Sequence, residues 1–378
     1  MKIRFSKFTI LILIICTSCN IFEDEISEEV VIEPVPQKPP KPRPLVPTKD
    51  LIQTDCFEPD STAPILKSDD FFIGSKWNEP HLLVHENLQM LFVSSSIEGD
   101  LSQTGIYRLT STDGILWERN PNTPIVRKND YDWVGQHVHS PSVIHYKDKF
   151  HLFFETNNGD DLFYTYIGHA TSNDGLNWEI AESPIVSPTR NFLDFHGLKV
   201  SKPGAAVRGN EILLYFAGTG FHSEIEDQDL LKGSFIESIG LITSDDGESW
   251  TDPANILLPD QILYPRSENG DNLFFGFSAP QPLVLNNEVF LFFEVINEDP
   301  TIRAAGLTFA YSPNGKDDFE QQEEYIFETN DFWWSQSEIR SPSVYKNGRD
   351  IHLWYAGHQT RGLTTTLGVG SATCRLRQ

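Results

Sequence analysis

Charged and polar residues occupy alternate positions just before a proline in four segments of the chain. They stand two and four positions before that proline, as Lys76 and Asn78, His137 and His139, Lys199 and Ser201, and Glu338 and Arg340. The residues between them, Trp77, Val138, Val200 and Ile339, are apolar. Because side chains alternate between the two faces of a strand, the polar set is predicted to share one surface. Ammonium, guanidinium and imidazole groups gathered there would favour an anionic ligand.

The segments that position these residues belong to a repeat. Five inner strands begin at residues 79–82, 140–143, 202–205, 279–282 and 341–344, and an aromatic second strand follows each of them, at 90–92, 152–154, 214–216, 291–293 and 353–355. Short strands recurring at a period of about 60 residues are typical of a propeller. The sequence predicts an all-β, five-bladed β-propeller with four-stranded antiparallel blades over residues 52–378.

The two ends of the repeat array complement each other. The unit Ala63-Pro64-Ile65-Leu66 precedes the first full blade, whereas the last copy stops after its third strand, near Ala372. We therefore expect the N-terminal strand to form the outer strand of the last blade, which closes the ring and leaves no free sheet edge. Cys56 and Cys374 would then form a disulfide across this seam, with two free thiols as the alternative.

Three Asp-Gly pairs recur after the third strands, at Asp113-Gly114, Asp174-Gly175 and Asp246-Gly247, each followed by a tryptophan. In such a turn the aspartate caps backbone N–H groups and the glycine adopts a positive φ. We interpret these pairs as structural.

The pattern strand-Ser-x-Asp-Gly-x-x-Trp in a five-bladed array resembles the propeller glycoside hydrolases of the invertase, arabinanase and xylosidase group, over residues 60–378. In that group an aspartate precedes the proline of the first inner strand, so the resemblance implies that Glu79 is the base or nucleophile. Ser142 stands where the group has a second acid, and Lys202 stands near its general acid. Two of the three carboxylates that the resemblance implies are therefore missing at these positions, which argues against hydrolysis.

Glycoside hydrolysis by inversion needs two carboxyl groups about 6.5–9.5 Å apart. We predict Glu79 as the base and Glu338 as the acid. Arg340 and Lys199 would lower the pKa of a nearby carboxylate, which suits a base better than an acid. Glu155 and Glu294 end second strands and are predicted to be solvated there, with a reach to the upper face as the alternative.

The remaining candidates would bind rather than react. Trp133, Trp333 and Trp334 would stack on sugar rings or pack between blades, and the fourth blade offers Arg266 and Glu268 in its longer loop. The cationic set favours a uronic, sulfated or phosphorylated sugar. His137-x-His139 has the spacing of two metal ligands, but the sequence shows no third one. No cofactor is predicted, and a Ca²⁺ ion in the hub is the alternative.

The first residues have the features of a targeting segment. Lys2, Arg4 and Lys7 precede the apolar run 8–15, and small residues lead to Cys19. This predicts a lipoprotein signal peptide over residues 1–19 with lipidation of Cys19, so the protein would be anchored to a membrane in the bacterial cell envelope, outside the cytoplasm. An ordinary secreted protein or a retained anchor helix are the alternatives. The acidic, proline-rich stretch 20–51 would be an extended tether.

The formal net charge of −25 argues against nucleic acid as a partner. We expect a monomer whose partners are a carbohydrate and, through the lipid, a membrane. The leading hypothesis is a glycosidase. A catalytically silent propeller that binds saccharide at its hub is the alternative, and a structural surface scaffold is a third.

Overall fold

The computed structural model describes residues 46–67, 70, 75–97, 104–135, 137–158, 161–220, 235–258, 274–296, 306–361 and 364–377. The predicted signal peptide with Cys19, the tether before residue 46, and Arg266 and Glu268 lie outside these residues. Residues 45–378 form one compact unit. Apart from two short 3₁₀ turns, Thr48–Asp50 and Thr54–Cys56, the secondary structure in the described ranges consists of strands. No helix in those ranges is long and apolar enough to cross a membrane.

The strands form five blades in chain order. They are β3 (Ser75–His85), β4 (Leu88–Ile97), β5 (Gly105–Ser111), β6 (Glu118–Arg119) and β7 (Val126–Arg127) in blade 1; β8 (Val138–Tyr146), β9 (Lys149–Asn158), β10 (Asp161–Ser172) and β11 (Glu179–Ile180) in blade 2; β12 (Lys199–Arg208), β13 (Glu211–Gly220), β14 (Phe235–Ser244) and β15 (Ala254–Leu257) in blade 3; β16 (Phe274–Leu285), β17 (Glu288–Ile296), β18 (Gly306–Ser312), β19 (Glu320–Gln321) and β20 (Phe327–Glu328) in blade 4; and β21 (Glu338–Asn347), β22 (Asp350–Arg361) and β23 (Thr364–Arg375) in blade 5.

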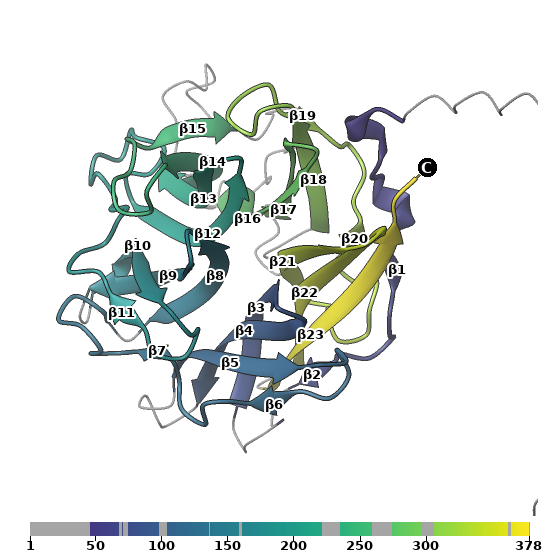
Figure 1. The fold of residues 1–378 in the computed structure, drawn as a ribbon, viewed down its shortest axis with the longest axis horizontal. Coiled ribbons are helices and arrows are strands. Elements are labelled where there is room, and N and C mark those ends of the chain that lie inside the picture. The colour runs from purple at the N-terminus through teal and green to yellow at the C-terminus, as the bar shows by residue number, and fades with distance from the viewer. Residues whose placement is uncertain are drawn as a thin grey trace, which may run out of the picture. The chain divides into compact units, whose positions relative to one another are not determined.

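The first strands of the five blades surround the centre, as Figure 1 shows for β3, β8, β12, β16 and β21. Within each blade the successive strands pair antiparallel, and blades 3 and 4 are joined into one sheet because the start of β14 pairs in parallel with β16. The predicted five-bladed propeller is confirmed.

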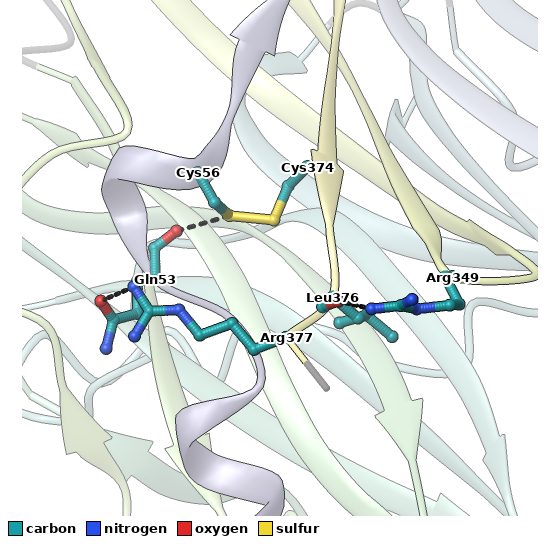
Figure 2. Close-up of a disulfide and its surroundings, with 6 residues drawn as sticks. All are labelled: Gln53, Cys56, Arg349, Cys374, Leu376 and Arg377. Atoms are coloured by element: carbon teal, nitrogen blue, oxygen red, sulfur yellow. Dashed lines mark hydrogen bonds between the residues drawn. A yellow bond between two sulfur atoms is a disulfide. The ribbon is translucent and has the colours of Figure 1, made fainter. Parts of the chain in front are cut away.

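Blade 5 is completed by the N-terminal part of the unit. The strands β1 (Glu58–Pro59) and β2 (Leu66–Lys67) both pair antiparallel with β23, and Ile65 N–H donates to the Val369 carbonyl at 2.7 Å. The predicted disulfide is present between Cys56 and Cys374, whose Cα atoms are 5.0 Å apart. Figure 2 shows this seam, where Arg377 donates a hydrogen bond to Gln53. The seam therefore has both a sheet pairing and a covalent bond.

Apolar side chains fill the space between neighbouring blades. Trp77, Leu91 and Tyr107 of blade 1, for example, form one buried cluster with Trp354 and Val369 of blade 5. The aromatic second strands predicted from the sequence supply much of this core, because alternate side chains of a blade face opposite neighbours. The hub is thus held by packing on every side.

The Asp-Gly turns are structural, as predicted. Asp174 Oδ1 accepts the N–H groups of Leu176 and Asn177, each at 2.8 Å, and Gly175 has a φ of 69°. Asp113 and Asp246 accept the corresponding N–H groups in their own turns. These aspartates stabilise loops between strands and lie outside the cavity described below.

Candidate active site

A β-bulge interrupts each inner strand at the residue before its proline. These residues, Glu79, Ser140, Lys202, Ala279 and Ser341, have φ values of 54, 51, 48, 49 and 53°, and the strand register shifts at each of them. A non-glycine residue in this region costs about 1–3 kcal/mol and persists only where the surroundings enforce it. The bulge brings two consecutive side chains to the same surface. Asn78 and Glu79 therefore both face the hub.

The bulged strands enclose a cavity of about 190 Å³ at one end of the hub. It is lined by Asn78, Glu79, His137, His139, Glu155, Lys199, Ser201, Lys202, Glu237, Glu294, Ile296, Glu338 and Arg340. Glu79 and Lys202 also line a narrower space, which is formed by the five pre-proline residues, four of their prolines and Gln281. All the predicted hub-facing pairs contribute to the cavity, except that Lys76 is not among the lining residues of the described part of the chain.

The three tryptophans proposed as stacking faces do not line the cavity. Trp334 is fully buried, with its ring stacked on Tyr355, so the prediction that it offers a face to a sugar is wrong. Trp133 stacks on Phe154 and donates its indole N–H to the Ala181 carbonyl, which matches the alternative of packing within the fold. Trp333 is 54% exposed and remains open to solvent outside the cavity.

Glu79 is held as an anion by one of its two oxygens. Its Oε2 accepts hydrogen bonds from Ser94 Oγ and from the Ser140 N–H, both at 2.9 Å, and lies 3.3 Å from His139 Nδ1. Burial alone would raise the pKa of this carboxyl. The hydrogen bond and charge of His139, with the charges of Arg340 and Lys202, outweigh burial and hold the pKa of Glu79 well below its usual value. None of the hydrogen bonds in the described part of the chain uses Oε1, which leaves that oxygen for a ligand or water.

Glu155 and Glu294 are not solvated strand ends, so that prediction is wrong. They are 7% and 1% exposed, and each links one blade to the next. Glu155 Oε2 accepts the Lys202 N–H at 3.2 Å, while Glu294 Oε2 accepts the Ser341 N–H at 2.9 Å. The reason is the bulge, because its N–H turns out of the sheet and needs an acceptor from the preceding blade.

The other oxygen of each of these carboxylates pairs with a cation. Glu155 Oε1 lies 2.9 Å from His137 Nε2, and Glu294 Oε1 contacts Lys202 Nζ. Burial opposes ionisation of Glu155, but the charge and hydrogen bond of His137 outweigh it, and the pKa of Glu155 is lowered. Both carboxylates are thus committed to holding the ring.

Glu338 lies between two basic groups. Its Oε2 is 3.2 Å from Arg340 Nη1 and 3.0 Å from His358 Nδ1, and His358 Nε2 lies 3.4 Å from Asn78 Oδ1. Burial, with the charge of Arg340, lowers the pKa of His358. Sequence reasoning missed His358, which stands opposite Glu338 in the register of β21 and β22. Only that register connects the two residues.

Glu237 of β14 lines the cavity and was also missed by sequence reasoning. It lies opposite Thr219 of β13, and Thr219 lies opposite Lys199 of β12. The alternation Phe235-Ile236-Glu237-Ser238-Ile239 contains the signal, because a charged residue in an apolar strand needs a polar surface to face.

The cavity is not the basic site that the sequence indicated. Its cationic and imidazole groups, His137, His139, Lys199, Lys202 and Arg340, are matched by five glutamates, one from each blade: Glu79, Glu155, Glu237, Glu294 and Glu338. His137 and His139 stack with their ring centroids 4.1 Å apart, and each faces a different carboxylate. In the described residues no group of three His, Cys, Asp or Glu side chains is arranged to hold a metal ion.

The fold is shared with solved structures of low sequence identity. They include a glycoside hydrolase (12% identity, TM-score 0.63, covering 84% of this chain and 92% of that one) and a thermostable family-43 glycoside hydrolase (16%, 0.58, 78% and 89%). An N-acetylgalactosamine deacetylase from F. plautii in complex with blood group B trisaccharide is also similar (14%, 0.59, 85% and 96%). No protein-family model and no curated protein sequence matches the chain. The likeness shows that this chain shares the five-bladed propeller fold of these structures.

Proposed function

We propose that this protein hydrolyses glycosidic bonds of a glycan in the hub cavity, with Glu79 as the base. The observation that carries the proposal is the state of Glu79, which is buried at the cavity, held ionised by His139, and has one oxygen outside the hydrogen bonds described above. A desolvated carboxylate in this position can take a proton from water as the water attacks a sugar carbon. The similar structures described as glycoside hydrolases support this reading.

Glu338, which the sequence predicted as the acid, has a different role in this proposal. Its contacts with Arg340 and His358 stabilise the carboxylate form. An anion near the scissile bond would stabilise the positive charge that develops on the sugar ring in the transition state. We therefore place Glu338 beside the reacting sugar, as a group that stabilises charge.

The glycan need not be strongly anionic. Lys202 is paired with Glu294, Arg340 with Glu338, and both histidines face carboxylates. Within the described residues Lys199 is the cationic lining residue for which no ion pair is shown. A glycan that presents one acidic group would match this arrangement, and a neutral glycan would also be accommodated. The expected setting is the bacterial cell envelope, with Cys19 lipidated.

The test is turnover of oligosaccharides. The purified protein is incubated with a panel of neutral and uronic-acid-containing oligosaccharides, beside the Glu79→Gln variant. We expect release of shorter sugars by the wild type and a loss of at least about 100-fold in the variant, because general base catalysis is removed. Turnover that is unaffected by the substitution would refute the assignment of Glu79. Binding without any turnover by the wild type would support the saccharide-binding alternative instead.

A further inference from the structure

One row of side chains in blade 3 crosses three strands at the edge of the cavity. Lys199 of β12 is opposite Thr219 of β13, and Thr219 is opposite Glu237 of β14. Residues directly opposite each other in antiparallel strands present their side chains on the same face, about 5 Å apart. Lys199 and Glu237 both line the cavity. Thr219 lies between them on that face.

Two polar atoms of this row are buried without a hydrogen-bond partner in the described part of the chain. Thr219 is 1% exposed, and its Oγ1 has no hydrogen-bond partner among the residues that the structure describes. The same holds for Glu237 Oε2, which is also buried. A buried polar atom that is left unpaired costs about 1–3 kcal/mol. Of these two residues Glu237 lines the cavity, and an unpaired polar group there indicates a place where a ligand supplies a hydrogen bond.

The other carboxylates of the cavity already have partners within the protein for at least one oxygen. Glu79, Glu155 and Glu294 each accept a backbone N–H from the next blade, and each faces a cation or imidazole. Glu338 faces Arg340 and His358. Among the described lining residues, Glu237 is the carboxyl with neither kind of contact. Its carboxyl group is therefore the one left to contact a ligand.

We propose that the row Lys199–Thr219–Glu237 is the subsite for the leaving sugar and that Glu237 is its proton donor. This inference rests on the proposed hydrolysis and names the second catalytic residue for it. The Cα atoms of Lys199 and Glu237 are about 10 Å apart, two strand spacings, which leaves room for one sugar ring between their ends.

The chemical step is balanced by one water molecule. The O–H bond of Glu237 breaks and its proton passes to the glycosidic oxygen, while the bond from that oxygen to the anomeric carbon breaks and the electron pair leaves with the oxygen. Water attacks the anomeric carbon, and its proton passes to Glu79. The products are two sugars, each with a new hydroxyl group at the cleaved bond. Glu79 then loses its proton to solvent, and Glu237 takes one up from solvent.

The experiment compares two leaving groups on the same sugar. One substrate is the glycan that the wild type cleaves, whose leaving alcohol needs a proton. The other is the dinitrophenyl glycoside of the same sugar, whose leaving group departs without one. Glu237→Gln is expected to lose about 100- to 10,000-fold on the glycan and less than about tenfold on the dinitrophenyl glycoside. Glu237→Asp should recover part of the loss on the glycan.

Control measurements distinguish a failure of the proton transfer from Glu237 from a failure of the proposed hydrolysis. Glu211→Gln removes a carboxyl of the same blade that pairs with Lys316 outside the cavity and should leave both rates unchanged. Equal losses of Glu237→Gln on both substrates, or no loss on the glycan, would overturn the proton transfer while the hydrolysis stands. A wild type that cleaves neither substrate would overturn both.

Discussion

Blades 2 and 3 contribute to the same cavity with opposite arrangements of charge. In blade 2, His137 faces Glu155 of the same blade and His139 faces Glu79 of blade 1. Both imidazole groups of blade 2 therefore have a carboxylate partner. In the row Lys199–Thr219–Glu237 of blade 3, the described residues show no such pairing. The contacts between paired groups offset the free-energy cost of burying them, whereas for unpaired groups that cost is offset only when a ligand binds. The comparison separates carboxylates that hold the ring from carboxylates that meet a substrate.

The largest expected effect on stability concerns a ring-holding carboxylate. Glu294→Ala leaves Lys202, whose side chain is only 18% exposed, as an unpaired cation, and it leaves the Ser341 N–H without its acceptor. We therefore expect a loss of about 3–5 kcal/mol in the free energy of unfolding. Glu237→Ala removes no ion pair and should cost about 1 kcal/mol or less. Chemical denaturation of both variants measures the difference. Equal losses would remove the distinction between the two classes of carboxylate.

The disulfide offers a control in which stability changes and activity does not. Replacing Cys56 and Cys374 together by Ser frees the closing strands of blade 5, and the free energy of unfolding should fall by about 2–5 kcal/mol. The cavity lies elsewhere in the unit, so turnover below the unfolding temperature should match the wild type. A folded double variant without turnover would show that the seam and the cavity are coupled.

The blade 2 pair should make stability depend on pH. Burial would lower the pKa of His137, but the charge and hydrogen bond of Glu155 outweigh it and raise this pKa above the unfolded value. The contribution is therefore complete below about pH 6.5 and is lost as the pH rises through the folded pKa. Denaturation midpoints of wild type and His137→Gln, measured from pH 5 to 9, should converge toward the alkaline end. Parallel curves would show that the pair contributes no pH-dependent stability.

Much of the fold was predictable because its signals are local. The inner strands at Pro80, Pro141, Pro203, Pro280 and Pro342 gave the number of blades, and the Asp-Gly turns followed from their own sequence. The disulfide followed from the incomplete last blade. The hub-facing residues of the inner strands, such as His137 and Arg340, followed from the period of two residues in a strand.

The rest of the site depends on pairing between strands. Glu237 reaches the cavity, and His358 reaches Glu338, through the register between strands, which the sequence does not fix. Glu155 and Glu294 accept N–H groups that the bulges expose, and no local pattern foretold those bulges. Trp334 is a residue of the type that stacks on sugar rings, but its side chain is buried in the core.

The central claim is that a glycan binds against the unpaired row of blade 3, beside Glu79. A crystal structure of Glu79→Gln with a bound oligosaccharide tests it most directly. We predict a sugar in the hub cavity, with an oxygen within about 3 Å of the Glu237 carboxyl group and with the His137–Glu155 pair intact. A sugar bound outside the cavity, or one that makes no hydrogen bond with Glu237, would contradict the account.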